Sequence, residues 1–187
     1  MTRRLLTLCL LLSPLCLRAA PGFAELARLA DSPNELRGEF RQQKYLAALD
    51  TSLSSSGIFS YTRDATIRWE ILEPIRNQLI ITPDGLSSRQ GDDELLRLDA
   101  ASNPGAALLG ELLFAVLSAD WQRLERHFEV DAEIAAPGWS AHLRPRDAGI
   151  AQLFERVELR GERLLQSVVL YEQGGDVTTI QLDAAQE

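Results

Sequence analysis

The chain has 187 residues, of which 45% are hydrophobic and 25% charged, and a formal net charge of −8. Length and composition suit one globular domain preceded by a targeting segment, and they exclude a disordered chain. The acidic balance argues against nucleic acid and anionic membranes as partners, because both attract clusters of Lys and Arg.

The first 24 residues are typical of a cleaved secretory signal peptide. Arg3 and Arg4 precede an apolar run from Leu5 to Leu17, which is too short to span a bilayer stably. We expect cleavage between residues 20 and 24, with a cut after Ala24 fitting the small-residue rule better than one after Ala20. Residues 25–187 then form a single domain, and loss of three arginines brings its charge to −8 − 3 = −11.

Both cysteines, Cys9 and Cys16, lie in this segment, so its removal leaves no thiol for a disulfide. Cys16 could alternatively be a lipid-attachment cysteine that anchors the chain. Pro14-Leu15 ahead of it disfavours that interpretation, because the processing site requires small residues there.

The first half of the mature chain is predicted to be one helix followed by successive strands. The helix covers Phe23 to Ala30. The strands cover Leu36 to Leu49, Gly57 to Leu72 as a hairpin, Ile75 to Thr82, Leu86 to Arg89 and Leu95 to Leu98, and Thr51 to Ser56 is a polar connection. The end of the first strand, Tyr45 to Leu49, could alternatively be helical.

The hairpin carries the clearest pattern, with its turn near Arg63-Asp64. Every second residue is apolar, which indicates antiparallel strands with one buried face. Arg63 shares the parity of the apolar set. It is therefore either an inward arginine whose donors find acceptors or a turn residue with its head in water.

Pro104 to Leu117 is predicted to be a helix that begins after Asn103 and is apolar on nearly every side, with Glu111 as its only charge. Such a helix is either a core helix under the sheet or a lid over a cavity. Beyond it we expect a short turn or helix at Asp120-Trp121 and another over Ala148 to Gln152. The expected strands cover Leu124 to Ile134, Trp139 to Arg144, Leu153 to Leu159, Leu164 to Glu172 and Asp176 to Asp183. This order predicts an α+β fold, an antiparallel sheet covered by helices.

No group of residues predicts catalysis. His127 and His142 lack ligand-spaced neighbours, and no nucleophile elbow, phosphate loop or dinucleotide fingerprint occurs. The acidic trio 92–94 lacks the ligand alternation of a calcium loop and is better explained as a solvated turn. We therefore expect neither an enzyme nor a metal or cofactor.

The hairpin and its surroundings resemble the LolA family, periplasmic carriers of acylated lipoproteins. The resemblance rests on Gly57, Arg63, Arg68-Trp69, Pro74 and Asp84-Gly85, on the opening stretch 38–43 and on the closing stretch 167–182. It extends over nearly the whole mature chain. Departures are the lack of an aromatic pair after Gly85, Asp64 where the family often has Pro, and an end at Glu187 where the typical carrier continues.

The resemblance implies an incomplete, curved antiparallel β-barrel, a half-barrel, with helices as a lid over an apolar cavity. It implies that Arg63 is a latch bonded to carbonyls of the lid. The cavity wall would comprise Phe40, Phe59, Tyr61, Trp69, Ile71, Leu79 and Ile81, with Leu109, Leu112, Leu113 and Val116 from the lid.

The implied function is that of a soluble, monomeric periplasmic carrier of an acylated lipoprotein or another lipid-linked cargo. Its partners would be an inner-membrane donor complex and an outer-membrane receptor. The alternative is a periplasmic sensor or interaction module that uses the same half-barrel to bind lipid or a membrane protein.

Overall fold

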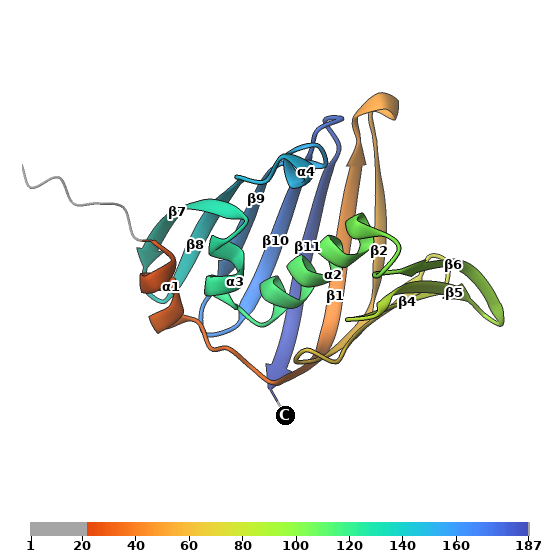
Figure 1. Cartoon of the computed structure of the whole chain (residues 1–187), viewed down its shortest axis with the longest axis horizontal. Coiled ribbons are helices and arrows are strands. Elements are labelled where there is room, and N and C mark those ends of the chain that lie inside the picture. Colours follow the sequence, from red (N-terminus) through yellow and green to blue (C-terminus); the bar gives the residue numbers. More distant parts are fainter. Residues whose placement is uncertain (1–21, 187) are drawn as a thin grey trace, which may run out of the picture.

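The computed structural model describes residues 22–186, so nearly all of the predicted signal peptide lies outside the described residues. The described chain forms one antiparallel sheet of eleven strands with short helices against it (Figure 1). The helices are α1 (Phe23–Leu29), α2 (Pro104–Leu117), α3 (Trp121–Glu125) and α4 (Ala148–Ala151), with a 3-10 turn η1 (Ala47–Leu49). The strands are β1 (Glu35–Leu46), β2 (Thr51–Thr62), β3 (Thr66–Glu73), β4 (Asn77–Thr82), β5 (Gly85–Gln90), β6 (Asp93–Asp99), β7 (Phe128–Ala135), β8 (Gly138–Pro145), β9 (Phe154–Gly161), β10 (Leu165–Glu172) and β11 (Val177–Gln186).

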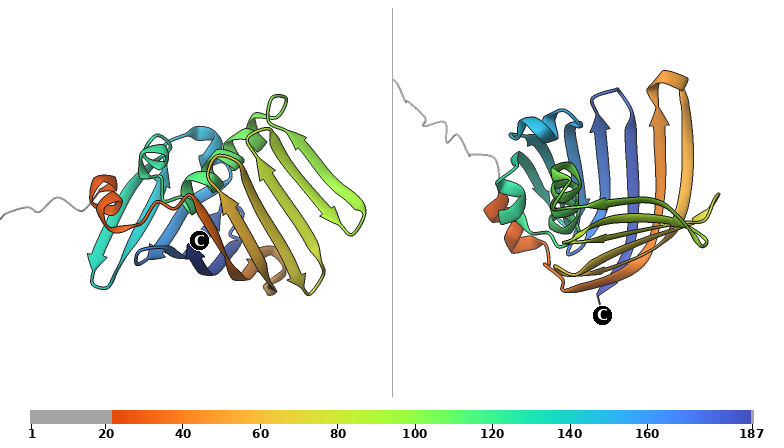
Figure 2. Two further views of the ribbon diagram at one scale, coloured as in Figure 1. Left: turned by 90° about the horizontal axis from the view of Figure 1, so that it is seen from below. Right: turned by 45° about the vertical axis from the view of Figure 1, so that its right-hand side comes forward.

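The sheet consists of two meanders, β1 to β6 and β7 to β11, and the first strand of one pairs with the last strand of the other. Its order is β6-β5-β4-β3-β2-β1-β11-β10-β9-β8-β7, so β11 lies beside β1 at the centre. The sheet is strongly curved and stays open, because β6 and β7 do not pair with each other (Figure 2). The predicted α+β half-barrel is therefore the observed fold.

The connection between the two meanders supplies the helices of the concave side. In Figure 1, α2 crosses in front of the central strands, and it contacts α3, β5 and β6. At the other side, α1 packs on α3 and β7. Phe23 at the start of α1 is 7% exposed and lies 6.3 Å from the ring of Trp121. A cut after Ala24 would thus remove a buried ring.

Two predicted boundaries are wrong. The predicted polar connection Thr51 to Ser56 is the first half of β2, which pairs with β1 from Leu46–Thr51 onward. This half of the hairpin extends beyond the core, where Leu53 is 58% exposed, so its strand carries no apolar alternation. The strand predicted from Leu124 begins at Phe128, because Leu124 belongs to α3 and is fully buried there.

Glycines allow the tight curl of the central strands. A Cβ on Gly57 of β2 would lie 1.9 Å from the carbonyl oxygen of Glu70, and one on Gly38 of β1 would lie 2.0 Å from that of Asp183. Phe40 pairs with Gly57 across β1 and β2 and stacks on Trp69, with 3.9 Å between ring centroids. The sheet therefore bends where the backbone is bare and aromatic rings fill the space.

Candidate functional site

The site with the clearest binding character is a cavity of about 210 Å³ between α2 and the concave face of the sheet. Its walls come from both meanders, and its roof comes from α2. The lining residues are Gln42, Ile67, Trp69, Leu79, Ile81, Leu109, Leu112, Leu113, Val116, Leu117, Phe128, Leu143, Phe154, Val157, Val168, Leu170, Ile180 and Leu182. All of them except Gln42 are apolar, so the cavity suits a hydrocarbon ligand.

Seven of the eleven residues expected at the cavity line it, namely Trp69, Leu79, Ile81, Leu109, Leu112, Leu113 and Val116. The other four do not line it. Phe40 and Phe59 are buried behind the ring of Trp69, with centroids at 3.9 Å and 5.7 Å. Tyr61 is buried near Phe114, 6.1 Å away, and Ile71 is a half-buried neighbour of the core.

The second meander forms the part of the wall that sequence reasoning did not assign to the site. Val168, Leu170, Ile180 and Leu182 lie on alternate positions of β10 and β11 and face the cavity. Their alternation was a usable signal for a buried face. It did not show that this face lines the same cavity as the hairpin, because that follows only from the β1–β11 pairing.

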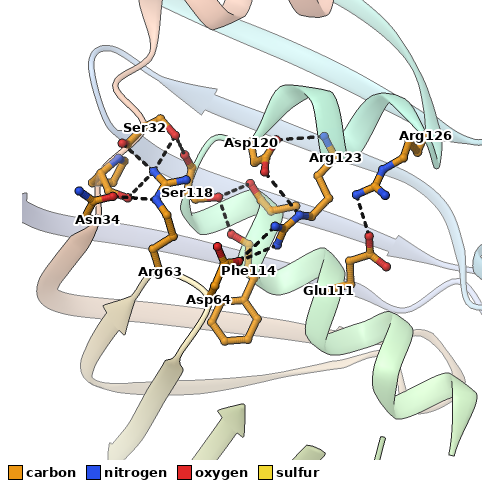
Figure 3. A network of polar contacts seen from close by, with 12 residues as sticks. Ser32, Asn34, Arg63, Asp64, Glu111, Phe114, Ser118, Asp120, Arg123 and Arg126 are labelled. Carbon is orange, nitrogen blue, oxygen red and sulfur yellow. Dashed lines mark hydrogen bonds and ion pairs between the residues drawn. The ribbon is translucent and has the colours of Figure 1, made fainter. Parts of the chain in front are cut away.

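Arg63 holds the segment between α1 and β1 (Figure 3). Its Nη2 donates to the carbonyl oxygens of Ser32 and Pro33, both at 2.7 Å, and its Nε donates to Oδ1 of Asn34 at 2.8 Å. The Ser32 hydroxyl in turn donates to the carbonyl oxygen of Ser118 at 2.7 Å, at the C-terminus of α2. Arg63 therefore reaches the lid through Ser32, whereas the resemblance led us to expect a direct bond to lid carbonyls.

A second set of contacts joins the same turn to the helices. Arg123 of α3 donates to Oδ1 of Asp64 through both terminal nitrogens at 3.1 Å. Asp64 has φ +51°, a left-handed conformation that Asp tolerates and Pro cannot adopt. The departure from the family's Pro thus supplies an ion pair between the hairpin turn and α3 (Figure 3).

Glu111, the charge on α2, faces away from the cavity. Its Oε1 accepts a bond from Nη2 of Arg126 at 3.1 Å and lies 3.5 Å from Nε2 of His127. These contacts anchor the outer side of α2 to the residues just after α3. On the sheet, burial raises the pKa of the Tyr61 hydroxyl of β2 above its ordinary value, which is already above physiological pH, so this group is neutral.

The described residues form an apolar binding site. No cluster of three metal-ligating side chains occurs among residues 22–186. In the same part of the chain, no helix combines the length and apolarity needed to cross a bilayer. A roofed apolar cavity on an open half-barrel is the geometry of a protein that binds an apolar ligand.

Comparison with known proteins gives the family. Residues 31–187 match the family model described as outer membrane lipoprotein carrier protein LolA. The chain is 32% identical over 183 residues to an outer-membrane lipoprotein carrier protein of Alkalilimnicola ehrlichii, covering 96% of this chain and 81% of that protein. The chain belongs to the LolA family, whose members are periplasmic lipoprotein carriers and not enzymes.

Solved structures with a similar arrangement are more distant in sequence. A LolA superfamily protein from Nitrosomonas europaea aligns with a TM-score of 0.49 at 8% identity, over 90% of this chain and 94% of that one. A DUF1329 family protein from Desulfovibrio piger aligns with a TM-score of 0.49 at 9% identity, over 88% and 90%.

Proposed function

We propose that this protein is a monomeric periplasmic carrier that binds the acyl chains of a lipoprotein or another lipid-linked cargo in the cavity under α2. It would collect the cargo from an inner-membrane donor complex and deliver it to an outer-membrane receptor. The observation that carries the proposal is the cavity itself, whose lining is apolar at every position except Gln42. Membership of a lipoprotein-carrier family supports the same conclusion.

The driving force is burial of methylene groups. Each contributes about 0.8 kcal/mol, so one chain of about sixteen carbons supplies on the order of 12 kcal/mol before the costs of binding. The cavity volume of about 210 Å³ is below the roughly 300–1,000 Å³ of ligand pockets. Loading therefore requires α2 to move away from the sheet.

Such a carrier must also release its cargo, and the polar contacts around α2 provide for that. Arg63, through Ser32, and Asp64, through Arg123, fasten the closed arrangement without touching the ligand. Cargo entry would break part of this network, and its re-formation would help to expel the cargo. Arg63 and Asp64 would thus be latch residues that balance retention against delivery.

The test is native mass spectrometry with lipid extraction on protein purified from periplasm without detergent. A bound acylated species would support the carrier and identify its cargo class. An apo mass together with failure to take up a fluorescent acyl probe would overturn the proposal. Transfer of the bound lipid to acceptor vesicles would then distinguish a carrier from a sensor, which should hold lipid without passing it on.

A further inference from the structure

The inward side of β1 changes in polarity along its length. Leu36 and Phe40 are buried, whereas Gln42 and Lys44 are half-buried on the same side of the strand. Strand β2 follows the same trend, since Tyr61 and Phe59 are buried near its end and Ser55 stands opposite Gln42. One end of the concave face is therefore closed by aromatic rings, and the other end is polar.

Gln42 lies where the two regions meet. It is the polar member of the cavity lining, and its backbone neighbours across the sheet are Ser55 and Ile180. Its carboxamide forms no hydrogen bond within residues 22–186, whose polar contacts involve other side chains. A carboxamide in an apolar wall has two N–H donors to satisfy, and covering it without a partner is costly.

The polar groups beyond Gln42 already satisfy one another. The Nζ of Lys44 lies 2.8 Å from Oε1 of Glu172 and 3.7 Å from Oδ2 of Asp176. The hydroxyl of Thr178 donates to the same Glu172 oxygen at 3.2 Å. This cluster marks the hydrated end of the concave face, and Gln42 is the side-chain amide at the cavity that has no partner among residues 22–186.

We infer that the side-chain amide of Gln42 donates a hydrogen bond to the carbonyl oxygen of the cargo's acyl group, an ester or an amide. The inference rests on the proposed function and adds the orientation of the cargo. The hydrocarbon lies under α2, toward Trp69, Leu79 and Leu113. The carbonyl lies at Gln42, and the polar remainder leaves past Lys44 and Glu172. Gln42 would thus select acyl chains over plain hydrocarbons of the same length.

A matched pair of ligands tests this assignment. Methyl palmitate and hexadecyl methyl ether have nearly the same shape, but only the ester has a carbonyl. Their affinities would be measured by displacement of the dye N-phenylnaphthylamine from wild type and from Gln42→Met, which keeps the size of the side chain and removes the donor. Gln43→Met is the control, because Gln43 is the same residue type one position along β1 and is exposed on the opposite side.

Wild type and Gln43→Met should bind the ester about 2- to 10-fold more tightly than the ether, as expected for one neutral hydrogen bond. Gln42→Met should lose this preference and bind the ether as well as wild type does. An equal affinity of wild type for the two ligands, or a preference that survives in Gln42→Met, would overturn the inference and leave the carrier function standing. Failure of both ligands to bind wild type would overturn the carrier function itself.

Discussion

At the level of single residues, Arg63 ties the segment before β1 to the hairpin turn without entering the apolar cavity. Its guanidinium accounts for four hydrogen bonds to three consecutive residues, Ser32 to Asn34. Three of these acceptors are neutral carbonyl or amide oxygens. The bonds are charge-assisted because the guanidinium that donates them is positively charged. Because none of them involves the cavity lining, their strength can be altered without changing the binding surface.

We therefore expect Arg63→Leu to fold, to retain cargo longer and to deliver it more slowly. Loss of these bonds would destabilise the closed, empty protein relative to the loaded protein by about 1–2 kcal/mol. Release would then be about 5- to 30-fold slower. The measurement is the rate of transfer of a fluorescent acyl probe from loaded protein to acceptor vesicles.

Arg68→Leu is the matched control, since Arg68 is an exposed arginine on the next strand, pairing with Ile80 on β4. Its release rate should equal that of wild type. Normal release by Arg63→Leu would show that this arginine is not a latch.

The sequence predicted the side of the strand on which Arg63 lies only as one of two alternatives, and it could not identify the acceptors. The alternation of apolar and polar residues in 59–71 predicts only which face of the hairpin a side chain lies on, and it carries no information about contacts with other segments. The acceptors at residues 32–34 are brought to Arg63 by the β1–β2 pairing and by the backbone bond from Arg63 to Asn34, which no local pattern encodes.

At the level of elements, the curl of β2 depends on the missing side chain at Gly57. We expect Gly57→Ala to lower the free energy of unfolding by about 1–3 kcal/mol, because its Cβ would meet the Glu70 carbonyl at 1.9 Å. Urea unfolding followed by circular dichroism measures this. Gly174→Ala is the control, since a Cβ at Gly174 meets nothing within 4 Å, and equal stability of the two variants would contradict the argument.

Gly110 of α2 is buried against β4, so a substitution there tests whether α2 is a movable wall. A Cβ there would lie 3.5 Å from Cγ2 of Ile81, an ordinary contact, whereas a larger side chain would collide with β4. Gly110→Leu should push α2 outward and increase binding of an apolar dye to the empty protein.

Gly110→Ala serves as its control. It should leave dye binding unchanged and stabilise the protein by up to about 1 kcal/mol through helix propensity. If Gly110→Leu binds no more dye than Gly110→Ala, α2 is not the movable wall of the cavity.

Most strands and α2 followed from alternation and capping in the sequence, because these signals are local. The bounds of α2, Pro104–Leu117, agree with the predicted range, and Asn103 caps the helix by accepting a bond from the Ala106 amide at 3.0 Å. The outer half of β2 was missed because it is polar and mostly exposed, and its strand conformation comes almost entirely from pairing with β1.

At the level of the whole molecule, the open barrel leaves two free strand edges, β6 and β7. Free edges can pair with other chains unless charges oppose it. On β7 the outward positions are acidic and exposed, namely Glu129, Asp131 and Glu133. We interpret this stripe as protection of the edge.

Replacement of these three acids by Gln, Asn and Gln should cause association that increases with protein concentration, measured by sedimentation velocity. The control variant carries the same charge change at Glu35, Glu39 and Asp183, which are exposed on the central strands β1 and β11. It should remain monomeric. Association in both variants would mean that the loss of net charge, and not the exposed edge, causes the association.

The cavity as a whole was only half predictable. Trp69, Leu79, Ile81 and the lid residues were expected at the cavity because of the family resemblance, whereas alternation and the all-round apolar helix alone left core and cavity wall as alternatives. Phe40, Phe59 and Tyr61 have the same inward parity but are covered by other rings, a distinction that depends on depth along the strand and not on parity. Alternation shows which side of a strand is buried and cannot separate a cavity wall from solid core.

The pairing of β1 with β11 has a consequence for how the protein forms. It joins Leu36 to Gln186, so the centre of the sheet is made by residues nearly as far apart in sequence as the described chain allows. Contacts of this kind slow folding, because the intervening chain must be closed into a loop first. The floor of the cavity therefore cannot exist until the C-terminal strand has been synthesised, and a nascent chain would expose its apolar strands until that moment.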